Sequence, residues 1–214
     1  MRVAVSRLHF PVTTLGPGRR LGVWLQGCSI RCPGCISVDT WDEDSGMIDA
    51  EELLRAVDLH AREADGLTVS GGEPFEQPAA LASLLTRWRA SSDGSTLVFT
   101  GREFTDIAPW LERNPGLIDA VITGPFRSDV PQTLAMRGSD NQRLHVLSDL
   151  GREMLQFERM AGPSDRRLDV MFDRSGQAWM AGIPARGDIA RLRRALSAAG
   201  HSAATSAEPR TTTE

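Results

Sequence analysis

The chain has 214 residues, 41% of them hydrophobic and 24% charged, with a formal net charge of −4. These values are typical of a globular protein, and they exclude one that binds nucleic acid through a general excess of positive charge. No apolar run is long enough for a membrane-spanning helix, and the first seven residues contain no apolar stretch of signal-peptide length. The sequence therefore predicts a cytoplasmic protein that binds neither nucleic acid nor a membrane.

Two extended segments lie near the start of the chain. Residues 2–10 and 21–26 are short and contain β-branched and aromatic side chains, a pattern that predicts strands. A Leu-Gly-Pro-Gly turn at residues 15–18 lies between them. Arg19 and Arg20 follow this turn, and either contact with an anionic partner or a solvated surface pair explains two adjacent arginines.

The middle of the chain alternates between helices and strands. Asp49 is the expected N-cap of a helix whose apolar face contains Leu53 and Val57. The expected strands that follow are 66–70, 96–100 and 117–122, and the helices between them are 78–90 and 104–112. Each of these strands ends at a loop that contains glycine. The alternation predicts an α/β fold with a parallel sheet, and such folds place their chemistry at the carboxyl ends of the strands.

The alternation weakens after residue 128. Strands are expected at 143–147, 167–172 and 178–180, and a helix at 188–199. We expect a core over residues 1–148, a C-terminal extension over residues 149–200 that packs on the core, and a disordered polar tail over residues 201–214.

All three cysteines of the chain lie within eight residues, at Cys28, Cys32 and Cys35. The spacing Cys-x3-Cys-x2-Cys is too tight for a disulfide framework and favours a metal centre in a reducing compartment. Structural zinc sites and cubane clusters normally have four ligands, so three thiolates leave one position open. A [4Fe-4S] cluster with one open iron fits this count best. The alternative is a zinc site completed by one of the four distant histidines.

Three further segments, together with the cysteine triplet, resemble the sequence motifs of a known superfamily. Residues 70–74 are Ser-Gly-Gly-Glu-Pro, residues 99–101 are Phe-Thr-Gly, and residues 137–142 are Arg-Gly-Ser-Asp-Asn-Gln. In this order the segments resemble the radical S-adenosylmethionine (SAM) superfamily. They are most similar to its activating enzymes of glycyl radical enzymes, in particular those of anaerobic ribonucleotide reductases. The resemblance covers about residues 5–145.

The resemblance implies a fold, two cofactors and a site. The fold is an incomplete parallel β/α barrel of the radical SAM type. The metal ligands are Cys28, Cys32 and Cys35, which hold a [4Fe-4S] cluster whose open iron binds SAM. The residues implied to bind SAM are Ser70, Gly71, Gly72, Glu73, Thr100, Gly101, Arg137, Ser139 and Asn141. No other catalytic residue is implied, because the cluster and SAM carry the chemistry.

The resemblance also implies a reaction and partners. The reduced cluster cleaves SAM to methionine and a 5′-deoxyadenosyl radical, which removes a hydrogen from a glycine of a glycyl radical enzyme such as anaerobic ribonucleotide reductase. Flavodoxin or ferredoxin is the expected electron donor. One alternative is a stand-alone radical SAM enzyme that modifies a small molecule or a ribosomal peptide, which the unassigned C-terminal third and departures from the family pattern at Leu15 and Thr123 favour. The other is a non-catalytic iron–sulfur or zinc protein.

Overall fold

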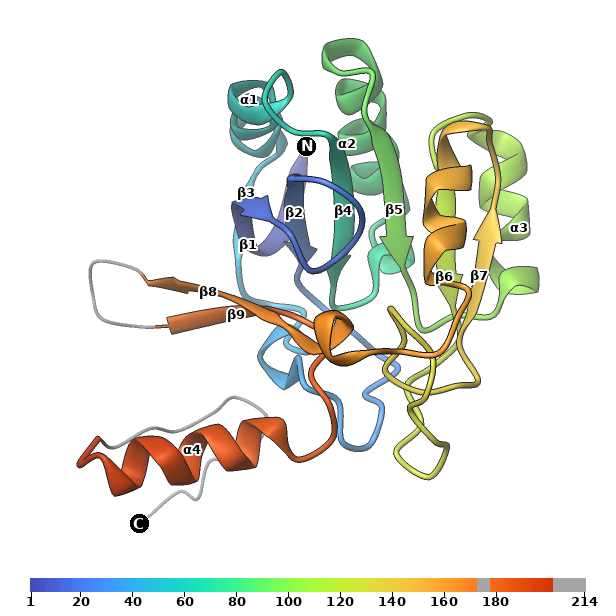
Figure 1. Cartoon of the computed structure of the whole chain (residues 1–214). Helices are drawn as coiled ribbons and strands as arrows, with labels where there is room; N and C mark the ends of the chain where they lie inside the picture. Colours follow the sequence, from blue (N-terminus) through green and yellow to red (C-terminus); the bar gives the residue numbers. More distant parts are fainter. Residues whose placement is uncertain (173–177, 202–214) are drawn as a thin grey trace.

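The computed structural model describes residues 1–172 and 178–201 (Figure 1). Its centre is a seven-stranded sheet with the strand order β3-β1-β2-β4-β5-β6-β7. These strands are β1 (Arg2–Val12), β2 (Arg20–Leu25), β3 (Met47–Asp49), β4 (Gly66–Gly71), β5 (Ser95–Phe99), β6 (Ala120–Thr123) and β7 (Arg143–Val146). The α-helices are α1 (Ala50–His60), α2 (Pro78–Ser91), α3 (Phe104–Arg113) and α4 (Asp188–Ala198). A separate hairpin pairs β8 (Leu168–Phe172) with β9 (Ala178–Gly182).

Short 3₁₀ helices lie in the connections. They are η1 (Val38–Thr40), η2 (Pro74–Glu76), η3 (Leu150–Phe157) and η4 (Pro163–Arg166). The sequence predicted neither these 3₁₀ helices nor β3, because segments of three to eight residues carry too little periodicity to be recognised.

The four central strands β2, β4, β5 and β6 run parallel, which confirms an α/β fold with a parallel centre. The helix α2 connects β4 to β5, and α3 connects β5 to β6. The outer strands β1, β3 and β7 are antiparallel to their neighbours. The reason is the length and content of the connections. Residues 13–19 are too few for a crossover from β1 to β2, and residues 124–142 between β6 and β7 contain no helix.

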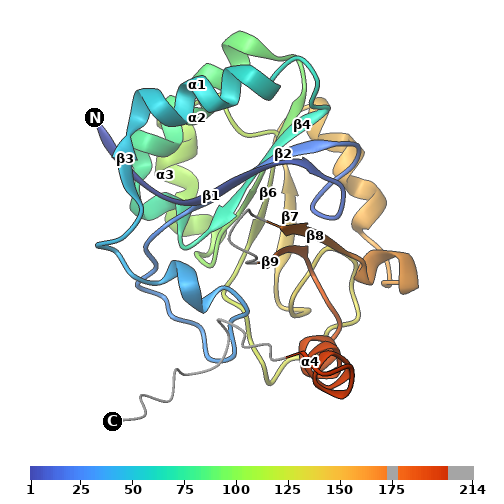
Figure 2. The same cartoon turned by 90° about the vertical axis from the view of Figure 1, so that its left-hand side faces the viewer.

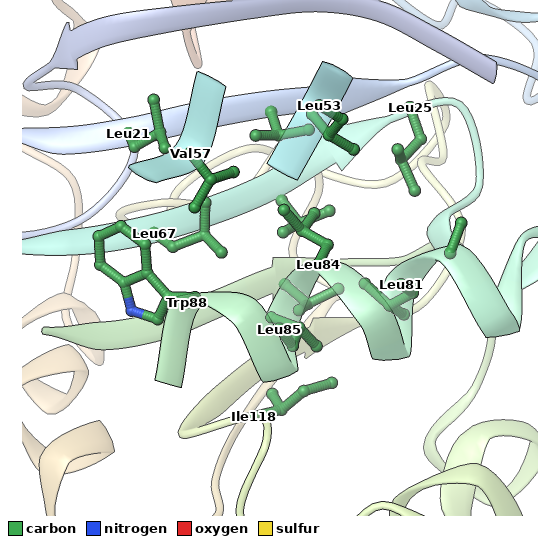
Figure 3. Packing of buried hydrophobic residues seen from close by; sticks show 14 of the residues in the cluster. Leu21, Leu25, Leu53, Val57, Leu67, Leu81, Leu84, Leu85, Trp88 and Ile118 are labelled. Atoms are coloured by element: carbon green, nitrogen blue, oxygen red, sulfur yellow. The ribbon is translucent and has the colours of Figure 1, made fainter. Parts of the chain in front are cut away.

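The helices α1, α2 and α3 all cover the same face of the sheet (Figure 2). The main core lies between them and the sheet, where Val57, Leu67, Leu84 and Trp88 pack together (Figure 3). The opposite face packs against η3 and the hairpin, for example through Trp24 of β2. All three helices lie on one face of this sheet, whereas a doubly wound sheet carries helices on both faces.

Arg20 is fully buried, so both explanations given above for it are wrong. Its Nε donates to the Thr68 hydroxyl at 2.7 Å, and its Nη atoms donate to the Ser95 hydroxyl at 3.0 Å and to the Leu67 carbonyl at 2.8 Å. Burial lowers the pKa of Arg20 to about 10, although the nearby Glu153 carboxylate opposes this shift. These hydrogen bonds replace the water around the guanidinium, which explains how a cation is tolerated in the protein interior.

No helix among the described residues is long and apolar enough to cross a membrane. The expected disordered tail lies outside the described residues except for His201. The stretch expected to be an extension contains η3, η4, the β8–β9 hairpin and α4. Its division from the core stays a prediction.

Leu84 is fully buried in the main core. We expect Leu84→Ala to lower the free energy of unfolding by about 2–5 kcal/mol, because it removes apolar contacts and leaves a cavity. Urea denaturation of the metal-free protein measures the change. Leu59→Ala on α1 is the control, since Leu59 is 74% exposed. Its effect should stay below about 0.5 kcal/mol. Equal losses in both variants would contradict the assigned core.

Candidate functional site

The cysteine loop leaves the sheet at the carboxyl end of β2. Gly27 has a φ of +94°, a left-handed conformation that glycine adopts without strain. Its N–H donates to the Thr40 carbonyl at 2.8 Å, and the Cys28 N–H donates to the Trp41 carbonyl at 3.2 Å. The two ends of the loop are therefore joined beside the sheet, and the three cysteines lie in the segment between them.

The three cysteines line one cavity with a volume of about 550 Å³. Cys28 is buried, whereas Cys32 and Cys35 are half-buried. Burial raises the pKa of the Cys28 and Cys35 thiols, and the negative charge of Cys32 raises the pKa of Cys35 further. A bound metal reverses this preference, because coordination to a cation stabilises the thiolate.

The donor set of this cavity suits an iron–sulfur cluster, because it contains three cysteine thiols and each cysteine of a cubane cluster binds a different iron. A structural zinc site normally takes four ligands. The described residues that line the cavity also include no histidine to complete a zinc site.

The glycine turn after β4 lies directly against the cysteine loop. The Gly72 N–H donates to the Leu25 carbonyl and the Glu73 N–H donates to the Gly27 carbonyl, both at 2.8 Å. A Cβ on Gly72 would overlap the Gly27 carbonyl, and a Cβ on Gly71 would overlap the Leu25 carbonyl. Gly71 also has a φ of +110°. Only glycine at both positions therefore allows the two loops to meet.

Glu73 is 1% exposed and uses both carboxylate oxygens within the protein. Its Oε1 accepts hydrogen bonds from the Phe75 N–H at 3.0 Å and the Thr100 hydroxyl at 2.7 Å. Its Oε2 accepts from the Gly101 N–H at 2.8 Å. Burial raises the pKa of Glu73, while these hydrogen bonds and the charge of Arg102 oppose the shift. The carboxylate therefore joins the end of β4 to the end of β5.

Most of the residues predicted to bind SAM line the same cavity as the thiols. These residues are Ser70, Gly71, Gly72, Glu73, Thr100 and Gly101. They come from the carboxyl ends of β4 and β5, as the α/β pattern predicted. The structure thus brings together the two motifs that the sequence separates by some forty residues.

The structure does not bring Arg137 to the cavity. Its side chain is 1% exposed and donates to the Ala135 carbonyl at 2.9 Å and the Phe157 carbonyl at 3.2 Å. It also forms an ion pair with Glu158. These contacts connect the segment before β7 to η3, which is a structural use of the guanidinium.

Ser139 and Asn141 also lie outside the cavity lining. The Ser139 hydroxyl accepts from the Arg127 N–H at 3.0 Å, and the Asn141 side-chain amide donates to the Pro125 carbonyl at 2.8 Å. The lining residue from this segment with a polar side chain is Gln142, which donates to the Gly124 carbonyl at 3.1 Å. A direct contact of Arg137, Ser139 or Asn141 with SAM stays a prediction.

Two polar side chains that the sequence did not single out hold the cysteine loop. The Glu76 carboxylate accepts from the Ser29 N–H at 3.1 Å and lies 3.7 Å from the Arg102 guanidinium. The Gln26 side-chain amide donates to the Asp42 carbonyl at 2.8 Å. Isolated Glu and Gln residues are common in loops, so only their nearness to the two motifs could have pointed to them.

The C-terminal part of the chain supplies a further wall of the cavity. Its lining residues are Gly182, Ile183, Pro184, Ala185, Arg186, Gly187, Ile189, Ala190 and Arg193. They follow β9 and continue into α4. The sequence had left the role of this stretch unassigned.

Comparison with known proteins identifies a family. A family model described as a 4Fe-4S single cluster domain matches residues 14–145, more than half of the chain. The anaerobic ribonucleoside-triphosphate reductase-activating protein of Enterobacteria phage T4 is 31% identical over 139 residues, which cover 63% of this chain and 88% of the relative. The protein of the same name from Escherichia coli K12 is 28% identical over 148 residues, which cover 65% of this chain and 96% of the relative.

A relative of a second kind is the pyruvate formate-lyase-activating enzyme of Listeria monocytogenes serovar 1/2a. It is 32% identical over 141 residues, which cover 62% of this chain and 56% of the relative. The chain belongs to the 4Fe-4S single cluster domain family, and within it to the radical SAM activating enzymes of glycyl radical enzymes. The cluster-binding family agrees with the donor set that lines the cavity.

Glu73→Gln tests the link between the ends of β4 and β5. Either orientation of the new amide places its NH₂ against a backbone N–H, that of Gly101 or that of Phe75. We expect the free energy of unfolding of the metal-free protein to fall by about 1–3 kcal/mol, as measured by urea denaturation. The control is Glu63→Gln at an exposed position. A Glu73→Gln midpoint equal to that of the parent protein would contradict the described role.

Proposed function

We propose that this protein binds a [4Fe-4S] cluster through Cys28, Cys32 and Cys35 and uses it with SAM to activate a glycyl radical enzyme of the anaerobic ribonucleotide reductase kind. The observation that carries this proposal is that the three cysteines and the glycine turn after β4 line one cavity. The names of the phage T4 and Escherichia coli relatives support the choice of partner.

When bound, the cluster supplies one electron that breaks a carbon–sulfur bond of SAM, giving methionine and a 5′-deoxyadenosyl radical. The protein contributes the ligands, the orientation of SAM and the exclusion of water. Cys28, Cys32 and Cys35 would hold the cluster and leave one position for SAM. The chemistry supplied there would remove a hydrogen atom from a glycine Cα of the partner, which would give 5′-deoxyadenosine and a glycyl radical.

The glycine turn is suited to hold SAM next to the cysteine loop. Gly71 and Gly72 present their backbone without side chains, so the amine of SAM is able to approach carbonyl oxygens of this turn closely. Thr100 and Gly101 lie beside the turn because Glu73 binds both of them. The ends of β4 and β5 therefore act together as one binding edge.

The proposal also covers the type of barrel, the C-terminal extension, the electron donor and the cellular compartment. A sheet with a parallel centre and with α1, α2 and α3 on one face (Figure 2) is compatible with an incomplete β/α barrel. The open side of such a barrel would admit a loop of the partner. Residues 149–200 form an extension of this core. Flavodoxin or ferredoxin is the proposed electron donor, and the cytoplasm is the proposed compartment because it keeps thiols reduced.

A second candidate function is the radical modification of a small molecule or a ribosomal peptide. The observation that favours it is the cavity wall after β9, which lies outside the residues that the family model matches. In this second candidate, the wall would be the place where the small molecule or peptide is selected.

Electron paramagnetic resonance distinguishes the two candidate functions. Reduced, cluster-loaded protein is incubated with SAM and the anaerobic ribonucleotide reductase of the same organism. We expect a glycyl radical doublet on the reductase, and no doublet when the target glycine of the reductase is replaced by alanine. Formation of 5′-deoxyadenosine without a doublet would reject the reductase as partner and favour the second candidate.

Cys32→Ala tests the ligand assignment. We expect the variant, after anaerobic reconstitution, to lose the visible absorption of the cluster and its iron content, because two local thiolates do not hold a cubane. The control is Asp44→Ala, which changes an exposed carboxylate that follows the cysteine loop. Near-normal iron content in Cys32→Ala would contradict the assignment.

A further inference from the structure

Residues 182–187 connect β9 to α4 along one side of the cavity. In Figure 1 this connection and α4 lie near the carboxyl edge of the sheet, on the same side as the cysteine loop. The lining side chains Ile183, Pro184 and Ala185 are apolar. The family model ends at residue 145, so this wall is not part of the stretch that identifies the family.

Arg186 fastens this segment to the loop after β6. Its Nη1 donates to the Ser128 carbonyl at 2.8 Å, and its Nη2 donates to the Arg127 carbonyl at 3.1 Å and to the Val130 carbonyl. One planar guanidinium therefore binds three carbonyls of a single loop. This geometry requires the fixed fork of arginine, because an ammonium group presents its protons from a single point.

A second contact between the same two segments lies beside Arg186. The Gln132 side-chain amide donates to the Pro184 carbonyl at 3.0 Å. Both contacts join side chains to backbone carbonyls, so they bind the segments together without requiring a large buried area.

The other end of the segment is held by the hairpin. The Asp169 carboxylate of β8 accepts from the Thr13 N–H at 2.6 Å and the Thr14 hydroxyl at 3.0 Å. The Arg7 guanidinium lies 4.3 Å from the ring centre of Trp179 in β9. The hairpin is thus anchored on the β1–β2 side of the sheet. By contrast, none of the α4 side chains in the described structure is buried. Arg186 and Gln132 are therefore two polar contacts that fasten the α4 side, in addition to the packing of Ile183 against the core.

We propose that Arg186 is a positioning residue that holds residues 182–187 as a wall of the cavity and thereby limits access to the three cysteines. The apolar side chains of this wall exclude water from the place where the proposed function generates its radical. The shielding of a radical rests on the proposed function. The limited access of reagents to the three cysteines does not, because it requires neither a cluster nor SAM.

Alkylation of the metal-free, reduced protein tests this access directly. A bulky polymer-linked maleimide and the small reagent iodoacetamide are compared on Cys28, Cys32 and Cys35. We expect Arg186→Ala to raise the rate with the bulky maleimide about fivefold, the change that corresponds to one net hydrogen bond. The rate with iodoacetamide should change little, because a small reagent already enters the cavity.

Two further variants make the comparison specific. Arg191 forms an ion pair with Asp188 of the same helix, α4. Arg191→Ala removes this cation and should leave both alkylation rates unchanged. Arg186→Lys keeps the charge and restores part of the hydrogen bonding, so its rate with the maleimide should lie between those of the parent protein and Arg186→Ala. Equal maleimide rates in the parent protein and Arg186→Ala would overturn the proposal. A parallel rise for both reagents would also overturn it, because that result indicates a disordered cysteine loop.

A second measurement connects the wall to the reaction. With loaded protein and its partner, Arg186→Ala should form more 5′-deoxyadenosine for each glycyl radical than the parent protein, because solutes with weak S–H or C–H bonds, such as a thiol reductant, reach the radical and donate a hydrogen atom to it. An unchanged ratio would contradict the shielding role. The alkylation result needs no cluster, SAM or partner, so failure of the inference is distinguishable from failure of the proposed function.

Discussion

The contact between Gly72 and the Gly27 carbonyl is the constraint on which the site depends. The cysteine loop has little regular structure of its own, so its position is set by what it touches. Gly72 allows the turn after β4 to approach closely enough for the Glu73 N–H to bond the Gly27 carbonyl. A side chain at position 72 would separate the two loops. The cysteines and the turn would then no longer line one cavity, and a ligand of both would lose one half of its site.

Two buried charges hold the opposite ends of the same pair of strands. An ionised group inside a protein is costly unless hydrogen bonds replace its water. The Glu73 carboxylate at the carboxyl ends of β4 and β5 meets three donors, and the Arg20 guanidinium at their amino ends meets acceptors from Thr68 and Ser95. The parallel centre of the sheet is therefore fixed in register at both ends. This rigidity suits a site that must keep a ligand in one orientation.

The parts of the structure that the sequence predicted are those encoded within short stretches. The alternation of helices and strands, the cysteine triplet and the glycine turn each depend on neighbouring residues. The parts that were missed depend on contacts between distant segments. The buried Arg20 donates a hydrogen bond to the Ser95 hydroxyl, and Arg186 donates to the Ser128 carbonyl across a gap of more than fifty residues. Arg137 belongs to a motif that resembles the family, yet its surroundings give it a structural contact with Glu158. No local pattern shows which distant groups these arginines contact.

The central claim is that the three cysteines hold a cluster whose open iron takes SAM beside the glycine turn. The most direct measurement is mass spectrometry of 5′-deoxyadenosine after the loaded protein is reduced with dithionite in the presence of SAM and no partner. The account predicts 5′-deoxyadenosine and methionine in equal amounts, and neither product from Cys32→Ala. Absence of both products from protein with a full complement of iron would contradict the account and leave a non-catalytic iron–sulfur protein.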